Sequence, residues 1–164
     1  NLSRAVVASE DARFYTHNGF GWIEIEKAVK DHKKGKKLRG ASTISQQTAK
    51  NVFLFPSRTI IRKAFEAYFT VLIEWIWGKE RILEVYLNVA EMGKGIYGAE
   101  AAAQELVGKK TSELTRHEAS IITASLPDPL ERHADKPSQY VSKRAGQIRS
   151  LIPKIGYPDW IEHK

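Results

Sequence analysis

Three clusters of polar residues in this chain could do chemistry, and the first is centred on Glu10. Glu10 and Asp11 follow an apolar stretch, residues 5–8, at a predicted helix end. A carboxylate beside buried apolar surface has its charged form disfavoured, so its pKa rises toward a value useful for proton transfer. Arg13 could orient or tune it. Glu10 is therefore a candidate catalytic base, although an acidic pair at a helix end is also a common structural feature.

The second cluster is a polar segment behind a glycine, where Ser42 or Thr43 can cap a helix. Thr43 and Gln46 have the spacing of a capping box. Free N–H groups at such a helix start can bind an anion. Gln47 and Lys50, three positions apart, would project from one face of the helix. The alternative is an ordinary capped amphipathic helix.

The third cluster combines three cations with one carboxylate. Arg58, Arg62 and Glu66 recur at intervals of four, so they share one stripe of a helix, with Lys63 beside them. These residues could form a cationic pocket for a diphosphate, in which Glu66 orients the cations or touches a sugar. They could equally be surface ion pairs worth only a few tenths of a kcal/mol.

Long helices are predicted to position these clusters. Residues 57–77 form the longest, followed after Gly78 by a helix over 79–91. Apolar residues recur along the first of these at steps of three and four, which predicts one apolar face. The residues on that face are Ile61, Phe65, Tyr68, Leu72 and Ile76.

Two further helices are predicted toward the end of the chain. Thr115 and Glu118 form a capping box that opens a helix ended by Pro127, and another begins near Pro137. No alternating run of useful length predicts a strand. We therefore expect an all-α fold in one domain spanning residues 1–164.

Composition agrees with a folded domain. The chain has 164 residues, of which 42% are hydrophobic and 27% charged, and it has no cysteine, which excludes disulfides and thiolate chemistry. The most apolar run, residues 67–77, is too short to cross a bilayer, which takes about 20 residues. Because the sequence begins at Asn1 without a Met, we expect it to be an excised domain from which a preceding N-terminal membrane anchor has been cut away.

The net charge of +7 is concentrated in residues 27–39, which hold seven cations and one anion. This segment is predicted to be a lysine-rich loop. It could contact anionic headgroups or a diphosphate, in which case neutralising its lysines would weaken binding to anionic vesicles at low salt. It could also be a solvated loop that serves only solubility.

In this order the clusters resemble the motifs of the peptidoglycan glycosyltransferases, which use a lipid-linked disaccharide-pentapeptide precursor. The first resembles an opening Glu-Asp pair followed by an aromatic residue, a His and a Gly. Residues 40–51 match Gly-x-Ser-Thr-Ile-x-Gln-Gln-x-x-Lys-Asn at every fixed position, residues 62–66 match Arg-Lys-x-x-Glu, and residues 79–88 match a fourth motif. The resemblance runs from about residue 5 to residue 151. In the fifth motif Arg144 and Arg149 are not adjacent, so they receive no role.

The resemblance implies a lysozyme-like fold with a larger helical lobe, a smaller membrane-facing lobe and a cleft between them. With no transpeptidase sequence following, the chain looks like the monofunctional branch. The implied reaction joins lipid II units with inversion, and Glu10 is the general base. Undecaprenyl diphosphate leaves, stabilised by cations, and Glu66 is the second catalytic carboxylate. The implied substrate-binding residues are Lys50, Arg58, Arg62, Lys63, Ser42, Thr43, Gln47, Asp11, Phe14 and His17.

Cofactors, partners and location follow from the same resemblance. No cofactor is required and no metal ligands are assigned, but Mg or Mn at the diphosphate is left open. The expected partners are lipid II, the growing lipid-linked glycan, the membrane surface and other cell-wall synthesis proteins, with no nucleic acid. The expected location is the bacterial cytoplasmic membrane, with the catalytic domain on its outer face.

Two other functions remain as alternatives. A lysozyme-like lytic enzyme also needs a carboxylic acid, but its leaving group is a sugar, so it has no use for four cations beside the cleft. A basic membrane- or nucleic-acid-binding module would explain the charge of residues 27–39 but not Glu10 or Glu66.

Overall fold

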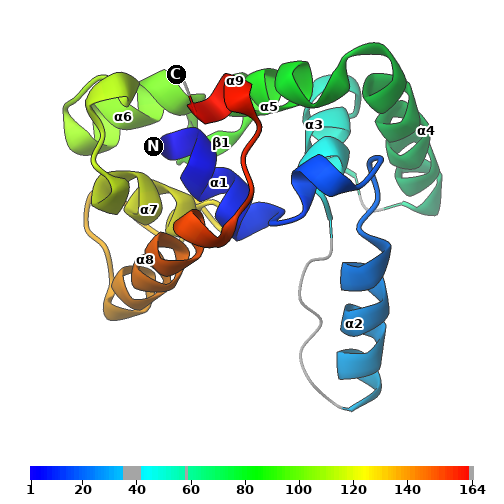
Figure 1. Cartoon of the computed structure of the whole chain (residues 1–164), viewed down its shortest axis with the longest axis horizontal. Coiled ribbons are helices and arrows are strands. Elements are labelled where there is room, and N and C mark those ends of the chain that lie inside the picture. Colours follow the sequence, from blue (N-terminus) through cyan, green and yellow to red (C-terminus); the bar gives the residue numbers. More distant parts are fainter. Residues whose placement is uncertain (35–41, 58, 163–164) are drawn as a thin grey trace.

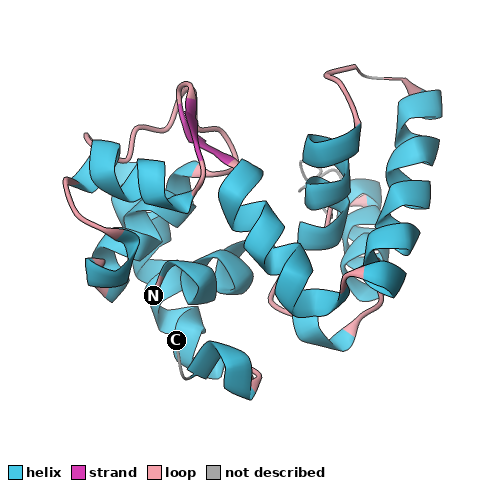
Figure 2. Ribbon diagram, turned by 90° about the horizontal axis from the view of Figure 1, so that it is seen from above, coloured by secondary structure: helices cyan, strands magenta, loops and turns pink. Residues whose placement is uncertain are grey.

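The computed structural model describes residues 1–34, 42–57 and 59–162. It is built almost entirely from helices (Figure 1, Figure 2). A hairpin of two short antiparallel strands is the addition to the predicted all-α fold, which is otherwise confirmed. In chain order the elements are α1 (Leu2–Glu10), η1 (Phe14–Thr16), α2 (Trp22–Lys33), α3 (Ile44–Phe53), α4 (Ile60–Ile76), α5 (Gly78–Val89), β1 (Glu91–Gly93), β2 (Ile96–Tyr97), α6 (Ala99–Val107), η2 (Thr111–Glu113), α7 (Arg116–Ser125), α8 (Gln139–Leu151), η3 (Ile152–Lys154) and α9 (Asp159–Glu162).

The helices form two groups. In the larger group α1 packs against α7 and α8, and residues 5–8 of α1 are fully buried there. In the smaller group α3 packs against α4 and α5. Figure 1 shows α2, α3 and α4 on the opposite side of the molecule from α6, α7 and α8, with α5 running between the two sides. The groups correspond to the larger and smaller lobes that the resemblance implies.

Local capping determines where several helices begin. The hydroxyl of Thr43 accepts from the backbone N–H of Gln46, and the side-chain oxygen of Gln46 accepts from the backbone N–H of Thr43. The predicted capping box is therefore confirmed. The box at Thr115 is confirmed in the same way. Thr59 caps α4, which therefore begins at Ile60 and not at residue 57 as predicted.

The prediction of a loop over residues 27–39 is wrong for its first part. Residues 27–33 belong to α2, and the exposed pair Glu26 and Lys30, four positions apart with 2.6 Å between Oε1 and Nζ, supports that helix. Residues 35–39 lie outside the described part of the chain.

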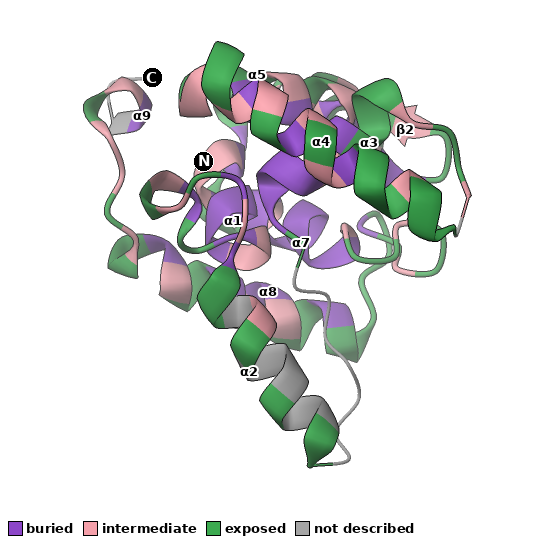
Figure 3. Ribbon diagram, turned by 90° about the vertical axis from the view of Figure 1, so that its right-hand side faces the viewer, coloured by how far each residue is buried: buried purple, intermediate pink, exposed green. Residues whose placement is uncertain are grey.

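The apolar face of α4 is at the surface of the protein. Ile60 is 89% exposed and Trp75 83% exposed, whereas Glu66 is only 3% exposed and Thr70 fully buried. Figure 3 shows α4 on the side that faces the viewer, with exposed segments along its outer surface. The inward face of the helix therefore mixes Glu66 and Thr70 with the buried Ile73, while most of its predicted apolar stripe lies outward, unlike an ordinary surface helix.

Candidate active site

Three helices meet at the carboxyl group of Glu10, which ends α1. Its Oε1 accepts from the Ser9 hydroxyl at 3.2 Å, and its Oε2 accepts from Gln47 Nε2 of α3 at 3.4 Å. The side-chain carbonyl of Gln47 in turn accepts from the hydroxyl of Tyr86, on α5, at 3.3 Å. Ser9 shares α1 with Glu10, whereas Gln47 and Tyr86 come from α3 and α5, so the hydrogen bonding of the carboxyl group depends on where α3 and α5 lie relative to the end of α1.

The environment of Glu10 favours its protonated form. Burial raises the pKa of this carboxyl group, and the nearby charge of Asp11 adds to the rise. The hydrogen bonds from Gln47 and Ser9, and the positive charge of Arg144, act in the opposite direction on the same pKa. A carboxyl group with a raised pKa that still retains donors for its charged form is suited to accepting a proton.

Asp11 and His17 join the chain after α1 to the start of α3. Asp11 is buried and accepts from the backbone N–H of Ile44 and from His17 Nε2, both at 3.0 Å. His17 Nδ1 accepts from the Gly19 N–H at 3.1 Å, so Nε2 carries the hydrogen that goes to Asp11. The hydroxyl of Thr43 donates to the Gly19 carbonyl at 2.6 Å. These bonds fix the N-terminus of α3, the helix that carries Gln47 and Lys50.

Phe14 lies behind this connection and is fully buried. The ammonium group of Lys79 lies 4.6 Å from the centre of its ring and 2.5 Å from Glu74 Oε1, which also accepts from the Ser45 hydroxyl at 2.5 Å. The cluster ties α3, α4 and α5 together. The surroundings of Asp11, Phe14, His17 and Thr43 thus favour a positioning role, and substrate contact by these residues stays a prediction.

A cavity of about 550 Å³ opens beside Gln47. It is bounded by α3, by the start of α4 and by the segment after α7. Among the predicted site residues that the structure describes, those in its lining are Gln47, Lys50 and Arg62, and Tyr86 lines it as well. Glu10 is not part of this lining, but it is hydrogen-bonded to Gln47, which lines the cavity together with the two cations.

Glu66 lies under the cations. Its two carboxylate oxygens accept from Arg62, at 2.9 Å, and from Lys63. Both oxygens are therefore occupied by cations, which favours the orienting role over direct contact with a sugar. Arg58 lies outside the described residues, while its neighbour Ser57 lines the cavity. Ser42 is described and exposed.

The sequence did not identify Tyr86, Ser9 or Arg144 as site residues. Tyr86 reads as one of several apolar positions on a helix, but a buried tyrosine needs a partner for its hydroxyl, and here that partner is Gln47. Arg144 of α8 donates to the Ser9 hydroxyl at 3.5 Å. These two residues are 135 positions apart, so no local pattern could have linked them.

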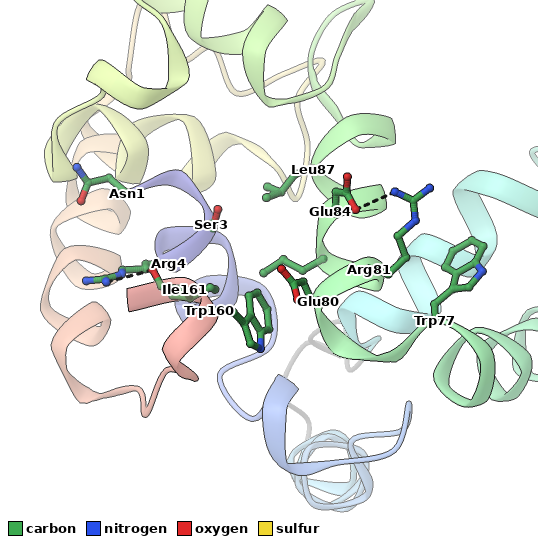
Figure 4. Close-up of a pocket in the computed structure, with 11 residues that line it drawn as sticks. Asn1, Ser3, Arg4, Trp77, Glu80, Arg81, Glu84, Leu87, Trp160 and Ile161 are labelled. Carbon is green, nitrogen blue, oxygen red and sulfur yellow. Dashed lines mark hydrogen bonds and ion pairs between the residues drawn. The ribbon is translucent and has the colours of Figure 1, made fainter. Parts of the chain in front are cut away.

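Another cavity, of about 440 Å³, lies between the start of α1, the α5 helix and α9 (Figure 4). Its lining includes Trp160, Leu87 and Glu80 but, among the described residues, none of the predicted site residues. An exposed ion pair between Arg81 and Glu84 closes one side. The cavity beside Gln47 has two of the predicted cations in its lining and also the residue that is hydrogen-bonded to Glu10, so we place the candidate active site there.

Known proteins resemble this chain over most of its length. It is 55% identical over 158 residues to the biosynthetic peptidoglycan transglycosylase of Bacteroides thetaiotaomicron, a match that covers 94% of this chain and 64% of that protein. It is 52% identical over 155 residues to the protein of the same name from Shewanella oneidensis, covering 94% of this chain and 66% of the relative. For the Caulobacter vibrioides relative, also of that name, the identity is 52% over 163 residues, with 98% and 71% covered.

The chain thus spans about two thirds of the length of these curated relatives. The family model described as "Transglycosylase" matches residues 1–152, nearly the whole described fold, including the Glu10 site and the cavity beside Gln47. The chain therefore belongs to the transglycosylase family.

Proposed function

We propose that this chain is a peptidoglycan glycosyltransferase that polymerises lipid II into glycan strands and releases undecaprenyl diphosphate. The observation that carries the proposal is the buried carboxyl group of Glu10, hydrogen-bonded to Gln47, which lines one cavity with Lys50 and Arg62. A base hydrogen-bonded to a residue of the cavity wall, with cations in the same wall, suits a reaction that removes a proton and expels a diphosphate. The names of the relatives support peptidoglycan synthesis as the process.

The proposed reaction proceeds with inversion at one carbon. Glu10 takes the proton from a sugar hydroxyl of the acceptor, whose oxygen then attacks the anomeric carbon of the growing chain. The bond from that carbon to the diphosphate oxygen breaks, and its electron pair leaves with the lipid diphosphate. Lys50 and Arg62 stabilise the charge that grows on this leaving group, while Glu66 holds Arg62 in place. Arg58 and Lys63 are proposed to add to the same positive field.

Turnover of purified lipid II tests this proposal. The wild-type protein should convert it into glycan polymer, and Glu10→Gln should lower the rate by about two to three orders of magnitude, the scale of losing a positioned base. Circular dichroism should show that the variant is folded. Near-wild-type turnover by the folded variant would remove Glu10 from the mechanism, whereas no polymer from the wild-type protein would reject the proposed activity.

Incubation with finished peptidoglycan separates the lytic alternative. A lytic enzyme would release soluble fragments from it and would leave lipid II unpolymerised. We expect this chain to polymerise lipid II and to release no soluble fragments from peptidoglycan, because the cations beside Gln47 suit a diphosphate leaving group.

The exposed face of α4 is proposed to rest on the membrane that carries the lipid substrate. Ile61, Phe65 and Trp75 lie on it, at 71%, 52% and 83% exposure, and Trp22 of α2 adds a further exposed indole. Exposed apolar surface of this extent marks an interaction site. Replacing Ile61 and Trp75 by Ser should weaken vesicle binding, whereas Leu130→Ser, an exposed apolar residue after α7, should not. Equal binding by all variants would reject this membrane surface.

A membrane location with the domain on the outer face is part of the same proposal. None of the described helices has the length and apolar character needed to cross a bilayer.

A divalent cation at the diphosphate is proposed only as an aid. Among the described residues no three His, Asp or Glu side chains gather to hold one, so the diphosphate oxygens would supply most of its ligands. Turnover with and without a chelator tests this point.

A further inference from the structure

A chain of hydrogen bonds approaches Glu10 from the side opposite Gln47. Arg144 of α8 donates from a guanidinium nitrogen to Ser9 Oγ at 3.5 Å, and Ser9 donates from Oγ to Glu10 Oε1 at 3.2 Å. A guanidinium group can only donate, and a hydroxyl group has one hydrogen. The direction of the chain is therefore determined: Ser9 accepts from Arg144 and gives its own hydrogen to Glu10.

Arg144 is held in position by its helix. Val141, Ala145 and Ile148 are buried on the face of α8 that packs against α1 and α7. Arg144 adjoins this buried stripe, is half-buried, and also donates to Gln147 one turn further along at 3.3 Å. The guanidinium group is therefore placed near the end of α1 by the packing of α8.

The charges around Glu10 give this placement an electrostatic meaning. Asp11 follows Glu10 directly, and its negative charge opposes ionisation of Glu10. Tyr86 faces Glu10 from α5, and burial with the nearby Glu10 carboxylate raises the pKa of Tyr86, so it remains neutral. Arg144 supplies a positive charge that favours the ionised carboxylate. A general base must be ionised before it can take a proton.

We propose that Arg144, acting through Ser9, is a positioning residue that holds the Glu10 carboxylate ionised and correctly oriented. This inference rests on the proposed function, in which Glu10 is the base. It predicts that loss of Arg144 matters most at low pH. Without the cation the pKa of Glu10 rises further, so a smaller fraction of Glu10 is ionised at a given acidic pH. At alkaline pH the carboxylate is ionised in either protein, and the difference closes.

Arg149 provides a matched control on the same helix. It is exposed, and its guanidinium group lies 2.9 Å from His117 Nδ1, away from Glu10. The experiment compares Arg144→Gln, Arg144→Lys, Ser9→Ala and Arg149→Gln with the wild-type protein. Two readouts are taken: the NMR titration of the Glu10 carboxyl carbon, assigned with Glu10→Gln, and the pH dependence of kcat/KM for lipid II polymerisation.

We expect Arg144→Gln to raise the titration midpoint of Glu10 and to move the acidic limb of kcat/KM in the same direction. Its activity should fall about threefold or more at the acidic end and less than about twofold at the alkaline end. Ser9→Ala should act in the same direction. Arg144→Lys should restore most of the profile because it keeps the charge, and Arg149→Gln should behave as wild type.

An unchanged titration midpoint in folded Arg144→Gln overturns the proposal, whatever the activity. A pH-independent loss of activity also overturns it, because that is the result of a purely structural contact between α8 and α1. If the midpoint moves and the acidic limb does not, Glu10 is not the base and the catalytic part of the proposal falls. If the wild-type protein makes no polymer, the proposed function fails, and the titration still decides whether Arg144 controls the charge of Glu10.

Discussion

Gln47 donates from Nε2 to Glu10 Oε2 over 3.4 Å, although the two residues are 37 positions apart in the sequence. The same amide accepts from the hydroxyl of Tyr86, so its two ends are used by two different residues. A glutamine held at both ends has one orientation, with its donor toward the carboxylate. The hydrogen bond of Tyr86 therefore reaches Glu10 through Gln47.

Tyr86→Phe tests this arrangement. Removing the hydroxyl lets the amide of Gln47 turn, so we expect polymerisation to fall by about threefold to tenfold, less than for loss of the base itself. Gln47→Ala should cost more, and the double variant should be no worse than Gln47→Ala alone, because the two residues act in series. Tyr97→Phe, whose exposed ring lines the same cavity, serves as the control. If the losses of activity from Tyr86→Phe and Gln47→Ala instead added in the double variant, the two residues would act on Glu10 independently.

Glu10→Gln should make the protein more stable at neutral pH. The pKa of Glu10 in the folded state is raised above its ordinary value of 4.5. Between these two values the folded state binds more protons than the unfolded state, so stability falls as pH rises through that window and remains lower above it. Glutamine resembles the protonated form and avoids this loss.

The measurement is the melting temperature of both proteins as a function of pH. At about pH 7 the variant should melt at the higher temperature. The difference should close below the ordinary pKa of the carboxyl group. Glu84→Gln, which alters an exposed ion pair, should show no such pH-dependent gain. If the wild-type protein were instead the more stable one at neutral pH, burial of the ionised Glu10 carboxylate would not lower the stability of the folded state.

Glu66→Gln should have the opposite effect on stability. Glu66 is 3% exposed, and its loss leaves Arg62, itself only 17% exposed, without its partner. We expect the free energy of unfolding to fall by about 2–3 kcal/mol, somewhat below the value for a fully buried pair, because Lys63 remains half exposed. Chemical denaturation measures this loss, with Glu84→Gln as the exposed control. A stable but inactive Glu66→Gln would instead favour direct action on the substrate.

Lys50→Gln should lower kcat more than it raises KM. The ammonium group is at the surface of the cavity beside Gln47, where the departing diphosphate would gain negative charge. An interaction that strengthens in the transition state appears in the rate constant, and we expect a loss of about tenfold to a hundredfold. Lys109→Gln removes a cation paired with Glu118 outside this cavity and should leave both constants near wild type. If only KM rose, Lys50 would bind the substrate and the transition state equally well.

The local signals in the sequence were sufficient for most of the helices, but they predicted neither α2 nor α6. A capping box such as that of Thr43 and Gln46, or of Thr115 and Glu118, satisfies N–H groups within four residues, so its effect does not depend on distant parts of the chain. The same holds for the helix that Pro137 precedes, which begins beyond its cap at Ser138. The motif order also pointed to Glu10 and to the cations beside it.

Only the tertiary structure decided which side of α4 faces the protein and which residues surround Glu10. Periodicity predicts an apolar face but not what covers it, and here the buried face is the one with Glu66, Thr70 and Ile73, because it packs toward α3. Arg144 and Glu10 come together because α8 packs against α1. The sequence by itself thus determined most of the helices, α2 and α6 excepted, and the types of side chain available for the chemistry. The burial and the long-range contacts that position Glu10 and affect its charge depend on helix packing, which no local pattern encodes.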